Sequence, residues 1–179
     1  MPPQVTKCSN VEAKIFFTPN CQLESLTGKF ENFFNLNLLK HIKFLKVEYS
    51  DIVGPLPASI TELECESIEH SIFESLIHLK HARIYNIINS ERIQVPDSLQ
   101  SMRHLIFKDD QTLVLGACSE FYYTNTTPSC IDATRCTKSR VQIGAEEDCS
   151  FVPKIIFDSN RYKIKIRADA DLSVTLKSI

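Results

Sequence analysis

Apolar residues in the first half of the chain recur at intervals of three, and each run closes with an interval of two. The first run consists of Phe30, Phe33, Leu36, Leu39, Ile42, Leu45 and Val47, and similar runs close near residues 63–65, 82–84 and 105–107. An interval of three fits neither a helix, with about 3.6 residues per turn, nor a strand, with a period of about 2. A loop or helix that leads into a short strand would produce the pattern, with the closing apolar pair pointing inward. We therefore expect parallel strands centred on residues 45–47, 63–65, 82–84 and 105–107, stacked in chain order.

The chain also contains a near-duplication. The segment LKHIKF at residues 39–44 returns 40 positions later as LKHARI at residues 79–84. Each copy is followed by a proline–x–serine turn, at residues 57–59 and again at residues 96–98. A repeat of this size indicates a solenoid, in which each unit buries its apolar face on the next unit.

One of these units resembles a known family. Residues 42–63 read IKFLKVEYSDIVGPLPASITEL and follow the leucine-rich-repeat pattern L-x-x-L-x-L-x-x-N-x-L-x-G-x-[IL]-P-x-x-L-x-x-L, except that Ser50 stands where the family prefers asparagine. The resemblance extends over about residues 30–110. It implies an α/β fold, namely a short irregular leucine-rich-repeat solenoid with parallel strands on one side and helices or loops on the convex side.

Three regions follow from this interpretation. We expect an N-terminal cap at residues 1–29, leucine-rich repeats at residues 30–110, and degenerate repeats with a β-rich C-terminal cap at residues 111–179. A short helix is expected within residues 67–81, where apolar residues share one helical face, and another within residues 23–38.

Alternation of apolar and polar residues predicts strands in the C-terminal region. Residues 152–157 and 162–166 alternate around a polar turn, which predicts a hairpin, and residues 172–176 alternate in the same way. Lys163, Lys165 and Arg167 would share one face of their strand. A basic row of this kind commonly protects an edge strand from pairing, and we favour that interpretation over a phosphate or nucleic-acid patch.

Composition narrows the function classes. The chain of 179 residues has 20 basic and 22 acidic residues, a balance that gives no general attraction to nucleic acid. The apolar runs are too short for a membrane span, and no secretory signal pattern follows Met1. These observations predict a cytoplasmic protein without nucleic-acid partner, membrane span or evident small-molecule substrate.

The seven cysteines leave alternatives open. Cys118, Cys130, Cys136 and Cys149 are separated by 12, 6 and 13 positions, whereas zinc modules use ligand pairs two to four residues apart. We expect buried thiols at these positions and no metal. The alternative is an extracellular or cell-surface recognition domain in which these cysteines form two disulfides. Nucleophile elbows, zinc-binding helices and phosphate loops are missing from the sequence, so no cofactor and no catalytic residue is expected.

The outward-facing positions of the four expected strands form the candidate site. One column would contain Lys46, Glu64, Arg83 and Ile106, and the next Glu48, Glu66, Tyr85 and Lys108, flanked by Tyr49. Charged residues mixed with tyrosines are typical of protein-binding surfaces. The sequence therefore predicts a non-catalytic scaffold that binds a partner protein through its concave strand face. An enzyme with its site in the C-terminal region is a less favoured alternative.

Overall fold

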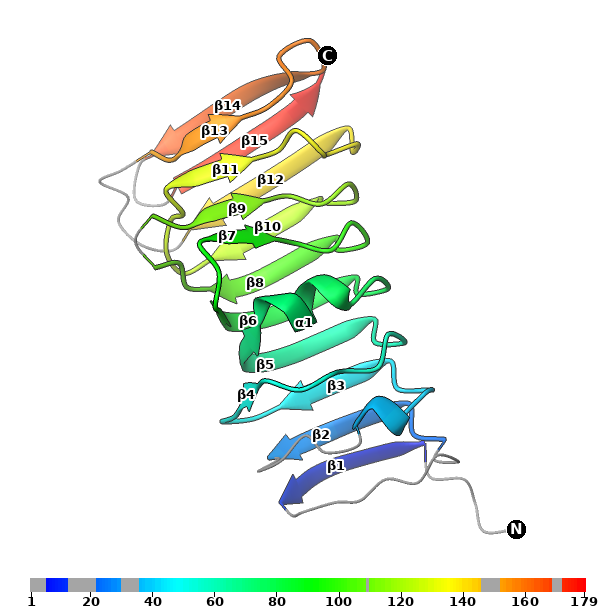
Figure 1. Cartoon of the computed structure of the whole chain (residues 1–179). Coiled ribbons are helices and arrows are strands. Elements are labelled where there is room, and N and C mark those ends of the chain that lie inside the picture. The colour runs from blue at the N-terminus through cyan, green and yellow to red at the C-terminus, as the bar shows by residue number, and fades with distance from the viewer. Residues whose placement is uncertain (1–5, 13–21, 30–35, 109, 146–151, 169–171) are drawn as a thin grey trace.

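The computed structural model describes residues 6–12, 22–29, 36–108, 110–145, 152–168 and 172–179. Within these ranges the chain forms a β-solenoid of about six turns with mostly parallel strands and little helix (Figure 1). Each turn adds one strand to the large sheet, which explains the periodic pattern of apolar residues in the sequence.

The principal element is an 11-stranded sheet, the large sheet. Its strands are, in spatial order, β1 (Lys7–Glu12), β2 (Ser25–Lys29), β3 (Phe44–Val47), β5 (Glu62–Glu69), β6 (His81–Ile88), β8 (Ser101–Leu105), β10 (Phe121–Thr124), β12 (Arg140–Ala145), β15 (Leu172–Ser178) and β14 (Tyr162–Ala168), with β4 (Asp51–Ile52) paired to the end of β5. All pairs are parallel as far as β12, and the last two are antiparallel. The pairing runs without a break across both expected region boundaries.

A second, smaller sheet lies against the C-terminal half of the large sheet (Figure 1). It contains the parallel strands β7 (Arg92–Gln94), β9 (Thr112–Val114), β11 (Cys130–Asp132) and β13 (Lys154–Ile156). Nearer the N-terminus, the same side is occupied by helix α1 (His70–Ser75) and the 3-10 turn η1 (Leu36–Leu38). The face of the large sheet that points away from these elements is called the outer face below.

The core is a ladder of in-register residues, one from each strand of the large sheet. Its interior members are Leu26, Leu45, Leu63, Ala82, Met102, Tyr122, Ile143 and Val174, and all are buried. From the first to the seventh member, consecutive positions are 18 to 21 residues apart in the sequence. Each ladder residue is thus covered by its counterparts in the coils before and after it, which removes its apolar surface from water.

The coil length also explains the duplication in the sequence. The backbone N–H of Leu39 donates to the carbonyl of Leu36, and the N–H of Leu79 donates to that of Leu76. The same kind of turn occurs between them, where the N–H of Ile60 donates to Pro57. The repeat of 40 residues therefore spans two coils, and the structural unit is half as long.

The strand prediction is confirmed in part. The strands expected at residues 45–47, 63–65 and 82–84 are β3, β5 and β6, and they are parallel neighbours in chain order. The fourth expected strand was placed three residues too late in the sequence. Ala82 on β6 pairs with Met102, whereas the prediction aligned it with Leu105. The closing interval of two falls at Leu105 and Phe107, whereas the ladder continues through Met102, which His104 follows at that interval.

The short helix expected within residues 67–81 is confirmed. Helix α1 has six residues, because residues 67–69 complete β5 and β6 already begins at His81. Within residues 23–38, the described part contains strand β2 and the turn η1, while residues 30–35 lie outside the described residues. The α/β character expected from the leucine-rich-repeat resemblance is therefore weak, since strands occupy most of the side where helices were expected.

The hairpin expected between residues 152–157 and 162–166 is not formed. Strands β13 and β14 flank the predicted turn but belong to different sheets, so they do not pair with each other. Strand β14 instead forms an antiparallel hairpin with β15. The polar turn after β13 carries the chain from the small sheet across to the large one, which is a solenoid crossover and not a hairpin turn.

The stacked turns leave no room for a side chain at Gly116. A Cβ atom at this position would lie 2.4 Å from the carbonyl oxygen of Pro96 in the preceding turn. We expect Gly116→Ala to lower the free energy of unfolding by about 1–3 kcal/mol, because a backbone atom would have to shift. Denaturant melts would measure this loss. Gly144→Ala is the matched control, since its Cβ would meet the ring of Tyr123 at 3.0 Å, which can tilt, and the backbone only at an ordinary contact distance, 3.8 Å from the carbonyl oxygen of Leu172. Equal losses of unfolding free energy in both variants would contradict the close approach of Gly116 to the backbone of Pro96.

Candidate functional site

A shallow groove of about 470 Å³ opens on the outer face, over the end of β3 and the middle of β5 and β6. Its lining consists of Lys46, Val47, Glu48, Tyr49, Glu64, Cys65, Glu66, Tyr85 and Ile106. Val47 and Cys65 are buried and form the floor, while Tyr49 and Ile106 are exposed. The alternation of the strands produces this arrangement, since every second side chain points away from the core.

An ion-pair network crosses the strands beside the groove. Glu64 lies 3.1 Å from Lys46 Nζ and 3.7 Å from Arg83 Nη1, so one carboxylate on β5 links the cations of β3 and β6. Lys46 also lies 3.5 Å from Glu48. The hydrogen bond to Glu64 and the charge of that carboxylate raise the pKa of Lys46 above its ordinary value. Opposite charges in register on neighbouring strands stabilise the sheet modestly and hold these side chains in place.

Glu66 differs from the other carboxylates of the groove. It is exposed, and no cation within the described residues lies within ion-pair distance of it. The groove therefore offers one carboxylate that is free to meet a positive group of a partner.

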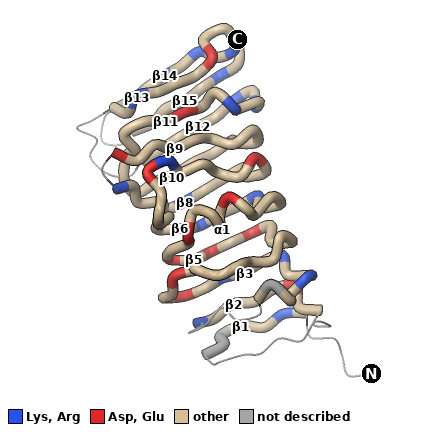
Figure 2. Tube along the Cα trace, in the orientation of Figure 1, with Lys and Arg blue, Asp and Glu red and all other residues tan. Residues whose placement is uncertain are grey.

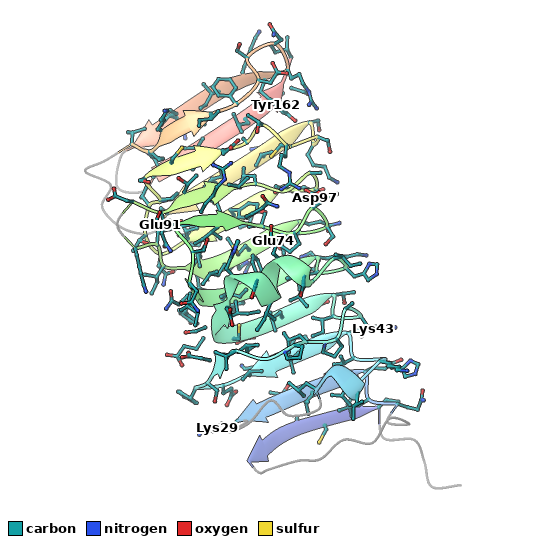
Figure 3. All side chains as sticks on the ribbon, in the orientation of Figure 1. Lys29, Lys43, Glu74, Glu91, Asp97 and Tyr162 are labelled. Atoms are coloured by element: carbon teal, nitrogen blue, oxygen red, sulfur yellow. The ribbon has the colours of Figure 1, made fainter. Side chains whose placement is uncertain are left out.

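Two tyrosines supply the aromatic surface of the groove. Tyr49 is 76% exposed and has a φ of 59°, a left-handed conformation that turns the chain away from β3. The ammonium group of Lys29, at the end of β2 (Figure 3), lies 4.8 Å from the centre of the Tyr49 ring. Tyr85 is 37% exposed, and its ring stacks on that of His104 with centroids 5.3 Å apart. Both rings are thus positioned by neighbouring side chains while part of each ring remains exposed.

The structure brings together most of the residues that the sequence singled out. Lys46, Glu48, Tyr49, Glu64, Glu66 and Tyr85 all line the groove. Arg83 lies in an adjacent depression of about 260 Å³ and is connected to the groove through Glu64.

The fourth strand requires two corrections to the columns. Arg103 is the register partner of Arg83, so it takes the place that was assigned to Ile106, although Ile106 does line the groove. Lys108 lies beyond the end of β8 and does not line the groove, and His104 is the residue that packs beside Tyr85. His104 has a φ of 66°, so the chain is irregular here, and strict alternation did not predict its position.

The cysteines show no pairing in the part of the chain that the structure describes. Cys118 and Cys130 are half-buried free thiols, and Cys136 is a buried one, whereas Cys149 lies outside the described residues. Burial raises the pKa of the Cys136 thiol to about 12, and burial likewise raises the pKa of Cys65. Within the same ranges, no three His, Cys, Asp or Glu side chains lie close enough together to hold a metal ion. The described helices include none that is long and apolar enough to cross a membrane.

No protein-family model, no curated protein and no solved structure matches this chain.

The ion-pair network makes a prediction about Lys46. We expect Glu64→Gln to lower the pKa of Lys46 toward its ordinary value, which NMR titration of the side-chain carbons would measure. Because the folded-state pKa is raised, the stabilisation is present at neutral pH and is lost as the pH rises through that pKa. The loss of unfolding free energy at neutral pH should stay within about 1 kcal/mol, since the pair is solvent-accessible. An unchanged pKa of Lys46 in Glu64→Gln would contradict the network.

The free thiols make a second prediction. Under native conditions and without reductant, a thiol-specific alkylating reagent should label Cys118 and Cys130 before Cys65 and Cys136, whose burial suppresses the thiolate. Peptide mapping by mass spectrometry would measure the order. The control is the denatured protein without reductant, in which all of these thiols should be labelled. Labelling of Cys118, Cys130 or Cys136 only after reduction would instead support the extracellular, disulfide-bonded alternative.

Proposed function

We propose that this protein is a non-catalytic scaffold that binds a partner protein through the groove on its outer face. The observation that carries the proposal is the exposure of Tyr49, Tyr85 and Ile106 side by side in one groove. Large apolar side chains on a soluble protein normally occur singly at the surface, and a cluster of them favours an interaction site.

The chemistry of the groove supports a protein as the ligand. Tyrosine supplies much of the binding energy at protein interfaces, because its rigid ring buries a large area and its hydroxyl forms hydrogen bonds. The groove is open and shallow, whereas small-molecule sites are concave and enclose most of the ligand. The unpaired Glu66 favours a partner that contributes a lysine or arginine beside an apolar side chain.

The proposal extends to family and location. We propose that the chain is an irregular member of the leucine-rich-repeat class, supported by the segment at residues 42–63 and by parallel coils near 20 residues in length. A cytoplasmic location is supported by the free thiols of Cys118, Cys130 and Cys136.

Affinity capture of partners from a cell extract, followed by binding measurements with the purified partner, would test the proposal. Tyr85→Ala should weaken binding at least about thirtyfold, which corresponds to about 2 kcal/mol. Ile77→Ala is the matched control, since Ile77 is 62% exposed but lies near α1 and outside the groove. Circular dichroism would verify that both variants are folded. Unchanged binding by Tyr85→Ala, or an equal loss in Ile77→Ala, would refute the groove as the binding site.

A further inference from the structure

The C-terminal end of the core is incompletely covered. The ladder of the large sheet continues from Val174 to Ile166 on β14, the last strand of the sheet. Tyr162, at the start of β14, is buried, and its hydroxyl donates to the carbonyls of Cys136 at 3.0 Å and Lys138 at 2.8 Å (Figure 3). Further along the same face, Ile164 is half-buried and Ile166 is 41% exposed. The strand is thus firmly anchored at one end, while no described strand pairs with its other edge.

The opposite face of β14 is basic. Lys163, Lys165 and Arg167 alternate along it, and all three are exposed. Lys163 is in register with Lys177 on β15, which is in register with Arg140 on β12. Figure 2 shows Lys and Arg along this end of the solenoid, whereas Asp and Glu occupy strand β5. None of these five cations has an ion-pair partner among the described residues.

Protection of an edge strand does not account for the whole basic row. Lysines on β14 would repel another copy of the same edge, as expected for an unpaired strand. Strands β12 and β15, however, are paired on both sides, so Arg140 and Lys177 protect no edge. Like charges directly opposite one another on neighbouring strands destabilise a sheet. Three cations in register across three strands therefore indicate a surface that is complementary to negative charge.

Strand β5 of the same sheet has an alternation of acidic and apolar residues that would complement the basic row of β14. On β5, Glu62, Glu64 and Glu66 face outward while Leu63 and Cys65 face the core. This acidic strand lies between β3 and β6, and Glu64 contacts a cation on each of them, at 3.1 and 3.7 Å. A strand that alternates acidic and apolar residues is thus stable in this fold between strands that each contribute a cation.

We propose that the free edge of β14 is a docking site for an extended acidic segment of a partner protein, which adds as a further strand to the large sheet. Its carboxylates would face Lys163, Lys165 and Arg167, at the strand spacing of about 4.8 Å. Its apolar residues would cover Ile164 and Ile166. Main-chain hydrogen bonds provide affinity in this mode of recognition, and the alternate side chains provide specificity.

The site is separate from the groove, because β14 is the terminal strand of the sheet whereas the groove lies over β3, β5 and β6. The basic row on β14 also determines which kind of segment can bind at this edge. It repels a second copy of β14, and it offers a neutral strand no compensation for desolvating the cations.

Binding of defined peptides to the full chain would test this site, measured by fluorescence anisotropy at low salt. The probe is a labelled peptide of alternating Glu and Val with blocked termini. A peptide of the same composition, with all Glu before all Val, cannot present one acidic and one apolar face. We expect this block peptide to bind at least about tenfold more weakly than the alternating one. N-methylation of every residue should weaken binding similarly, because it removes the main-chain donors on both edges of the peptide strand.

Charge reversal on the protein locates the site. The double variant Lys163→Glu, Lys165→Glu should bind the alternating peptide at least about tenfold more weakly, since attraction becomes repulsion at two positions. It should in turn bind a peptide of alternating Lys and Val better than the wild type does. Lys40→Glu with Lys43→Glu is the matched control, because both residues are exposed and lie near the other end of the solenoid (Lys43 in Figure 3). Thermal melts would verify that the variants are folded.

Three results would overturn the proposal. Equal binding of the alternating peptide, the block peptide and poly-L-glutamate would show a general polyanion surface without strand addition. Equal losses in the two double variants would show that binding follows net charge alone. No measurable binding of the alternating peptide at low salt would exclude the site altogether. None of these results bears on the groove, whose test uses Tyr85.

Discussion

The fold depends on one constraint, which is that each coil has to bury its apolar residues against the coils on either side. In-register rows such as Leu45, Leu63 and Ala82 are covered only by their counterparts in adjacent coils. Stability in such an array is a sum of contacts between neighbouring units, so the ends are the weakest points. The gradient of exposure agrees with this view. The interior of the ladder is buried, whereas Cys8 at the first strand is half-buried and Ile166 at the last strand is exposed.

Polar contacts within and between the coils hold the stacked turns in position. The hydroxyls of Ser119 and Tyr122 lie 2.8 Å apart in a fully buried position, and burial raises the pKa of the tyrosine. In the small sheet, Arg92 Nη2 donates to Asp132 across 2.8 Å. Burial opposes ionisation of Asp132, yet hydrogen bonds from Thr134 and Arg92 hold its pKa below its ordinary value. These contacts satisfy polar groups that would otherwise destabilise the interior.

The outer face can carry varied chemistry because the folding constraint leaves its side chains free. Every second residue of the large sheet points outward and contributes nothing to the ladder, so its identity can vary without loss of the core. The groove beside β5 combines tyrosines with carboxylates, and the edge at β14 combines lysines with uncovered isoleucines. The two surfaces differ in charge and position, so the two proposed binding sites are distinct.

The sequence by itself determined the solenoid, the parallel order of β3, β5 and β6, and the outward phase of Lys46, Glu64 and Tyr85. It could do so because the alternation within a strand follows directly from which side chains are apolar. Tertiary structure decided the register of β8, the small sheet and the partner of β14. Strands of three residues, such as β7 and β11, carry too little local pattern to be recognised and exist because neighbouring coils supply their hydrogen bonds. The sequence likewise did not predict that Arg140, Lys177 and Lys163 are aligned. These residues belong to three separate strands and are brought together only by the pairing of β12, β15 and β14.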